Sequence, residues 1–62
     1  MQMIDWATYT QFIKDYDNGI YPNQRMGQAF MNKFSITDDQ KLFYSQSRKT
    51  TESHIQTKYV KQ

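Results

Sequence analysis

The segment YPNQRMGQAFMNKF, residues 21–34, contains the only proline and one of the two glycines of this 62-residue chain. Pro22 suits the first turn of a helix, because that position needs no backbone N–H donor. Apolar residues then recur at helical spacing and indicate one buried face: Met26, Ala29, Phe30 and Phe34. We therefore expect a central helix over residues 22–34.

Gly27 lies inside this predicted helix, where glycine is about 1 kcal/mol less favourable than alanine. A glycine is useful there if another helix or a ligand comes close, and the small Ala29 nearby supports a close helix contact. Arg25, Gln28 and Asn32 form a polar strip off the apolar face. We interpret the segment chiefly as a structural element of the fold, with this strip as a candidate binding surface.

The residues before this segment predict a first helix over residues 5–18. Asp5 is the expected N-cap, since its carboxylate can accept hydrogen bonds from the first turn. Gly19 is expected to end the helix in the left-handed conformation, with Ile20 folding back on the last turn. An apolar stripe recurs at steps of three and four residues: Trp6, Tyr9, Phe12, Ile13 and Tyr16.

A third helix is expected over residues 38–46. Thr37 and Gln40 match the spacing of a capping box. Asp38 and Asp39 would then lie in the first turn, where negative charge suits the helix dipole. An apolar patch follows them, made of Leu42, Phe43 and Tyr44.

The last segment, SQSRKTTESHIQTKYVKQ, is ambiguous between helix and strand. Thr51, Ile55 and Tyr59 recur at helical spacing, but every second residue from 51 to 59 also fits a strand. We favour a helix over residues 48–60 that begins near Ser47 and frays toward Gln62.

The chain as a whole predicts one small all-α domain over residues 1–62, a bundle of three to four short helices without disulfides. It has no cysteine, and only 37% of its residues are hydrophobic, but 16% are aromatic. Each large ring can bury about 150–250 Å², so ten rings make a small core plausible. The start of the chain does not resemble a signal peptide, and no apolar run is long enough for a membrane span. We expect a cytoplasmic protein without membrane contact.

Catalysis is not expected from this sequence. His54 is the only histidine, and no partner for a general base or a metal stands at a recognisable spacing from it. Asp38 and Asp39 are adjacent on the predicted helix and point apart, so capping explains them better than paired acid–base work. We predict no catalytic residue, no metal site and no cofactor.

The aromatic content predicts a protein-binding surface. Ten rings are many for so small a core, and tyrosine is enriched at interface hot spots. We expect that some of the five tyrosines stay at the surface, for a protein partner or a second copy in a homodimer. The candidate partner-binding residues are Arg25, Gln28, Asn32, Tyr44, Arg48 and Tyr59.

DNA binding is the alternative. Residues 48–62 carry four basic side chains against Glu52, a net charge of +3: Arg48, Lys49, Lys58 and Lys61. A helix-turn-helix over residues 31–44 is less suitable, because Asp38 and Asp39 would face DNA phosphates at the start of its recognition helix.

Residues 5–50 resemble a class of very short helical proteins of tailed phages and prophages. The shared pattern consists of Pro22, Arg25, Gly27, Gln28, Ala29, Phe30, Asn32, Phe34, Leu42, Phe43 and Tyr44. The last helix of that class is more acidic and richer in alanine than the basic segment found here. The resemblance implies phage origin and a small helical fold. Since phages use many such proteins to occupy or inhibit host enzymes, polymerases and defence systems, we expect by analogy a non-catalytic protein that modulates or inhibits a host or competing macromolecule in the host cytoplasm.

Overall fold

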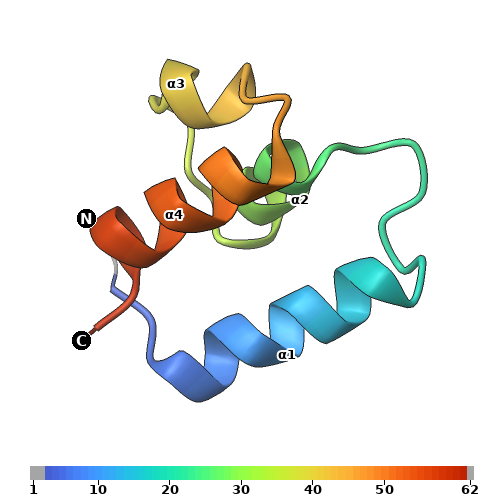
Figure 1. The fold of residues 1–62 in the computed structure, drawn as a ribbon, viewed down its shortest axis with the longest axis horizontal. Coiled ribbons are helices and arrows are strands. Elements are labelled where there is room, and N and C mark those ends of the chain that lie inside the picture. The colour runs from blue at the N-terminus through green and yellow to red at the C-terminus, as the bar shows by residue number, and fades with distance from the viewer. Residues whose placement is uncertain (1–2, 62) are drawn as a thin grey trace.

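Within residues 3–61, the fold consists of four helices and a short bridge between Ile4 and Val60. The computed structural model describes residues 3–61, with helices α1 (Trp6–Asp17), α2 (Met26–Lys33), α3 (Gln40–Phe43) and α4 (Arg48–Tyr59). Figure 1 shows α1 and α3 on opposite sides of the molecule, with α2 and α4 between them. The all-α prediction is confirmed.

Helix α1 begins and ends at the predicted residues. Asp5 Oδ1 accepts a hydrogen bond from the Thr8 amide at 2.8 Å, which caps the first turn. Gly19 takes the left-handed conformation with φ +81°, and its amide donates to the Tyr16 carbonyl. The Ile20 amide donates to the Asp15 carbonyl, which completes a Schellman motif. The side chain of Ile20 nevertheless stays exposed, so only its backbone folds back.

Helix α2 begins four residues later than predicted. The residues around Pro22 form a turn, in which Asn23 adopts a positive φ of 64°. Proline followed by a residue with positive φ suits the two central positions of a type II turn. The helix therefore starts only at Met26, after an extended Arg25 whose side chain makes no capping bond.

Helix α3 is a single turn, and the predicted capping box is wrong. The N-cap is Asp39, whose Oδ1 accepts a hydrogen bond from the Leu42 amide at 3.0 Å. Asp39 therefore lies before the helix and not within its first turn. The helix ends at Phe43, three residues short of the predicted end, and Tyr44 is its C-cap.

Helix α4 confirms the helical interpretation of the last segment. Ser47 is its N-cap, and the Ser47 hydroxyl accepts from the Thr50 amide. Beyond the end of α4, Val60 is buried in a parallel bridge with Ile4, and the Lys61 amide donates to the Ile4 carbonyl at 2.9 Å. Gln62 lies outside the described residues. This pairing joins the segment before α1 to the segment after α4.

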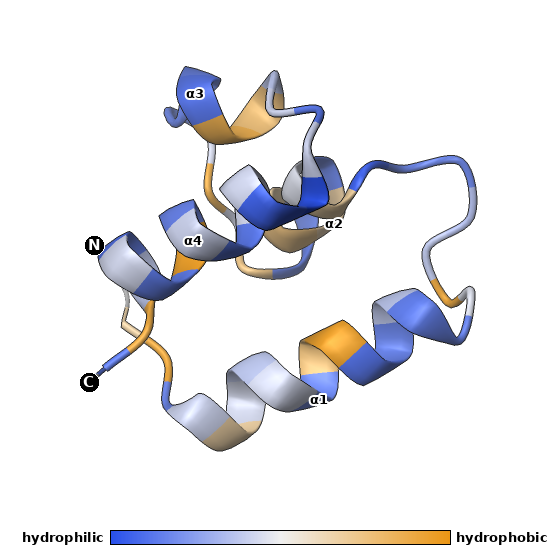
Figure 2. Cartoon of the chain, in the orientation of Figure 1, coloured by the Kyte–Doolittle hydropathy of each residue, from blue (hydrophilic) through white to orange (hydrophobic). Residues whose placement is uncertain are grey.

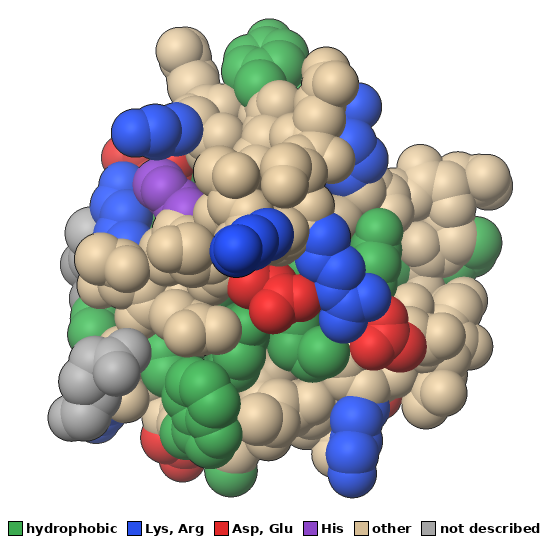
Figure 3. All heavy atoms as spheres, in the orientation of Figure 1, with side chains coloured by type: hydrophobic (Ala, Val, Ile, Leu, Met, Phe, Trp, Pro, Cys, Tyr) green, Lys and Arg blue, Asp and Glu red, His purple; other side chains and the backbone are tan. Residues whose placement is uncertain are grey.

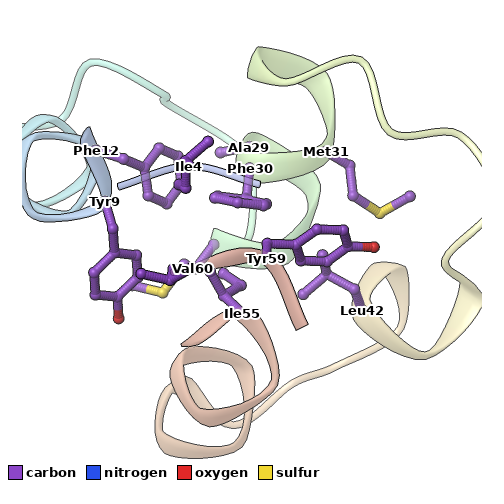
Figure 4. Packing of buried hydrophobic residues seen from close by; sticks show 11 residues of the cluster. Ile4, Tyr9, Phe12, Ala29, Phe30, Met31, Leu42, Ile55, Tyr59 and Val60 are labelled. Atoms are coloured by element: carbon purple, nitrogen blue, oxygen red, sulfur yellow. The ribbon is translucent and has the colours of Figure 1, made fainter. Parts of the chain in front are cut away.

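The core is built around Phe12 and Phe30, whose rings meet edge to face at 5.2 Å between centroids. Figure 4 shows the Tyr59 side chain beside Phe30, and 5.5 Å separates the centroids of the two rings. Aliphatic residues from every helix but α1 complete the cluster: Ala29, Met31, Leu42 and Ile55. Figure 2 shows that α4 is largely hydrophilic, which agrees with its position at the surface of this cluster.

Trp6 does not belong to this core, although the apolar stripe predicts it there. Trp6 is 52% exposed, and its ring contacts the buried Tyr9 at 5.2 Å between ring centroids. Trp6 is the first residue of α1.

At Gly27 the backbones of α2 and α3 approach each other closely. A Cβ atom built on Gly27 would lie 2.2 Å from the backbone oxygen of Leu42. The predicted reason for a glycine here, a close approach by a neighbouring segment, is confirmed. A surface groove described below is lined by side chains of both α2 and α3.

Candidate functional site

Asp39 is a buried carboxylate that joins α3 to α4. Its side chain is 3% exposed, and its two oxygens have separate partners. While Oδ1 caps α3, Oδ2 accepts hydrogen bonds from the Tyr59 hydroxyl at 2.6 Å and from His54 Nε2 at 2.8 Å. Lys58 Nζ lies 3.4 Å from the same oxygen. One carboxylate thus connects the start of α3 to three side chains of α4.

These contacts change the acidity of both Asp39 and Tyr59. Burial acts to raise the pKa of Asp39, but hydrogen bonds from Tyr59, His54 and the Leu42 amide outweigh it and hold this pKa well below its usual range. Burial and the neighbouring Asp39 carboxylate raise the pKa of Tyr59 well above its ordinary value. The folded protein therefore favours an ionised Asp39 and a neutral Tyr59.

We expect the free energy of unfolding to be highest between these two titrations. Because the folded-state pKa of Asp39 is lowered, its contribution is complete above the unfolded-state value of about 3.9 and is lost as the pH falls below it. Because the pKa of Tyr59 is raised, stability also falls as the pH rises above about 10. Urea unfolding, followed by circular dichroism at pH 3, 4, 5, 7 and 10.5, measures the loss of stability at acidic pH and at alkaline pH.

Asp38→Asn is the matched control for the loss of stability at acidic pH, since Asp38 is an exposed neighbour of Asp39. This variant should keep the full loss of stability between pH 5 and pH 3. An unfolding midpoint that stays constant from pH 7 to pH 3 in the parent protein would contradict the role given to Asp39.

The structure gives His54 a partner that no recognisable sequence spacing indicated. Asp39, fifteen positions earlier in the chain, holds Nε2 of its ring, and the side chain is only 19% exposed. An acid–imidazole pair of this kind can orient a general base. Among the described contacts, no hydroxyl or other nucleophile is hydrogen-bonded to the second ring nitrogen. The observed bonds account for His54 as a bridge between α3 and α4.

A groove of about 360 Å³ runs between α2 and α3. Apolar and aromatic side chains line much of it, and amide and hydroxyl groups stand among them: Met31, Ile36, Phe43, Tyr44, Gln28, Asn32, Gln40 and Thr37. Its only charged lining residue is Asp39, whose carboxylate is occupied by the contacts described above. The groove therefore offers apolar contact and neutral hydrogen-bonding groups.

Two aromatic rings at this groove remain open to solvent. Phe43 is 39% and Tyr44 is 67% exposed, and the two rings meet edge to face at 5.0 Å between centroids. Asn32 Nδ2 donates to Gln24 Oε1 at 2.9 Å, which holds its amide at the exposed surface of α2. Exposed rings beside polar groups are typical of protein interfaces.

The six predicted partner-binding residues occupy three different places. Gln28, Asn32 and Tyr44 line the α2–α3 groove. Arg25 and Arg48 line a separate small hollow of about 100 Å³. Tyr59 is 3% exposed and its hydroxyl is bonded to Asp39, so the prediction of a surface ring at this position is wrong.

The four predicted DNA-binding residues are also divided. The Arg48 guanidinium binds Asp17 at 2.8 Å and Glu52 at 2.6 Å, which connects the end of α1 to the start of α4. Lys61 follows the bridge at the chain ends. Lys49 and Lys58 line one shallow depression of about 730 Å³, together with Lys41 from α3.

Comparison of the chain with protein-family models, with curated proteins and with solved structures finds no match. None of the described helices has the length and apolar character required to cross a membrane. Within residues 3–61, no group of three or more histidine, cysteine or acidic side chains is arranged to hold a metal ion.

Sequence reasoning missed Lys41 and Phe43 as members of these surfaces. Lys41 is exposed on α3, far in sequence from the basic segment, and only the packing of α3 on α4 brings it to Lys49 and Lys58. Phe43 was expected to serve the apolar patch of its helix. Because α3 has a single turn, it buries Leu42 completely and leaves its neighbour Phe43 at the groove.

Proposed function

We propose that this protein acts by binding another protein through the α2–α3 groove, without catalysing a reaction. The exposed Phe43–Tyr44 pair carries the proposal, since two adjacent rings are left at the surface of a chain in which only 37% of residues are hydrophobic. Aromatic side chains supply large contact area at little cost in conformational entropy, and they dominate interface hot spots.

The chemistry of the groove indicates what its partner presents. Met31 and Ile36 offer apolar contact, while Gln28, Asn32 and Gln40 offer neutral hydrogen-bonding groups. An uncharged partner segment with one or two apolar side chains and accessible backbone groups fits this lining. The volume of about 360 Å³ suits side chains of that size.

The sequence resemblance to small phage and prophage proteins supports the biological part of the proposal. On that basis the partner is a host protein or a protein of a competing element, met in the host cytoplasm. The proposed effect is to modulate or inhibit the partner by covering its surface.

Tyr44→Ala should weaken binding of the partner about 30-fold, which corresponds to about 2 kcal/mol for loss of one hot-spot ring. The side chain is 67% exposed, so its removal should leave the fold intact. The test captures the partner from host lysate with the tagged parent protein, identifies it by mass spectrometry, and then measures affinity by calorimetry with both proteins purified.

Trp6→Ala is the matched control, because Trp6 is an exposed ring that lies outside the groove. It should change the affinity less than threefold. A partner that loses affinity with Trp6→Ala but not with Tyr44→Ala would contradict the assignment of the groove. Light scattering tests for a homodimer. If the parent protein is a dimer and Tyr44→Ala converts it to a monomer, the groove is filled by a second copy of the chain.

A further inference from the structure

The depression between α3 and α4 is strongly basic. Its lining consists of three lysines, the imidazole and three hydroxyl groups: Lys41, Lys49, Lys58, His54, Thr50, Ser53 and Thr57. No carboxylate belongs to this lining. Figure 3 shows this face, with basic side chains in blue around the purple imidazole. The polar groups of this lining are ammonium, imidazole and hydroxyl groups, and they stand among the apolar stems of the same side chains, which make up most of the lining surface.

Most of this positive charge is available to a ligand. Within the described residues, neither Lys41 nor Lys49 takes part in a salt bridge. Lys58 shares its charge with Asp39, at 3.4 Å, and Asp38 lines a neighbouring hollow beside Lys58. Two lysines, with a partial contribution from the third, therefore face solvent around the depression.

The arrangement of these groups is linear. Lys49, Ser53 and Thr57 follow one another at four-residue steps on α4, and Thr50, His54 and Lys58 form a second row beside them. From Lys49 to Lys58 the helix rises about 13 Å. One strand of a nucleic acid duplex presents a phosphate about every 3.4 Å along its axis, so the rows pass several phosphates.

We propose that this depression binds the phosphate backbone of double-stranded nucleic acid, without reading its base sequence. Lysines and hydroxyl groups are the side chains that contact phosphate oxygens. The depression has no tyrosine, tryptophan or phenylalanine in its lining, whereas single-strand sites use such rings to stack bases and protein interfaces are depleted in lysine. The site stands apart from the α2–α3 groove, with which it shares no lining residue.

Fluorescence anisotropy with a labelled 24-base-pair DNA duplex of arbitrary sequence tests the proposal. The full chain should bind at about 50 mM salt, with log K falling against log salt at a slope of about −1.8 to −2.7, as expected for two to three phosphate contacts. The double substitution of Lys41→Gln and Lys49→Gln should weaken binding about tenfold or more and bring the slope to about −0.9 or flatter.

Lys14→Gln with Lys33→Gln removes the same charge outside the depression and serves as the matched control. It should change the affinity less than threefold. Equal weakening by the two double variants, or no binding by the parent at low salt, would overturn the proposal. Binding of polyglutamate as tight as that of the duplex would also overturn it, in favour of an acidic protein. Tyr44→Ala should leave duplex binding unchanged, so this test is independent of the groove.

Discussion

Gly27→Ala is expected to lower the free energy of unfolding by about 2–3 kcal/mol, although alanine is the better helix former by about 1 kcal/mol. The added methyl would lie 2.2 Å from the Leu42 backbone oxygen and 3.3 Å from its Cδ1 atom. Because the main obstacle is backbone, no change of side-chain rotamer can relieve it. Helix α3 must move away from α2, and that movement would expose Leu42, which is fully buried.

Helix propensity and packing give opposite signs for this substitution, which makes the measurement decisive. A loss of about 2 kcal/mol should lower the melting temperature by about 8–16 °C in a domain of this size. Thermal unfolding by circular dichroism measures it. A variant that melts at or above the parent temperature would show that α2 and α3 do not approach as closely as described.

Gly19→Ala measures the cost of backbone strain without the steric clash that Gly27→Ala introduces. No atom lies within 4 Å of a Cβ at Gly19, but its φ of +81° is unfavourable for alanine. The cost there should be about 1 kcal/mol, from the left-handed backbone alone. A larger effect at Gly19 than at Gly27 would contradict the assignment of Gly27 as the contact point between α2 and α3.

Local sequence signals predicted the fold best where one residue had a single strong preference. Asp5 and Ser47 begin helices, and Gly19 ends one, because the side chain or backbone of each residue acts within its own turn. The ambiguous last segment became a helix because Thr51, Ile55 and Tyr59 lie together on the buried face of α4. A strand would have placed them along an edge with no neighbouring sheet to pair with.

Predictions failed where several local signals competed. Pro22 suits both the first turn of a helix and the second position of a β-turn. The chain forms the turn, in which the following Asn23 takes a positive φ. Thr37 and Asp39 are both good N-caps. Asp39 prevails because its second oxygen is met by Tyr59 and His54 from α4, a tertiary contact that no local pattern contains.

Sequence reasoning likewise placed some residues of the candidate surfaces correctly and misplaced others. Gln28, Asn32 and Tyr44 were found from helical spacing and exposure arguments, and they do line one groove. Tyr59 was misplaced because composition suggests that some tyrosines are exposed but not which ones. Its hydroxyl is satisfied by a buried carboxylate twenty residues away, so the whole ring can enter the core.

Asp39→Asn is expected to have the largest effect of the polar substitutions. The asparagine keeps an oxygen for the Leu42 amide, but its NH₂ group would face the Tyr59 hydroxyl and His54 Nε2, which both donate to Asp39. Removing one partner from a buried charged cluster typically costs about 3–5 kcal/mol. A core of this size rarely supplies more than about 3–5 kcal/mol in total, so the variant should be largely unfolded at 37 °C.

A graded series distinguishes this network from a general sensitivity of the turn before α3. Tyr59→Phe keeps the ring in the core and removes one hydrogen bond, so it should cost about 1–2 kcal/mol. Asp38→Asn should lie within about 0.5 kcal/mol of the parent, since Asp38 is exposed. Urea unfolding at pH 7 ranks the three variants. If Asp39→Asn and Asp38→Asn were equally stable, Asp39 could not be the carboxylate that connects α3 to α4, and the acid loss of stability would have to come from other groups.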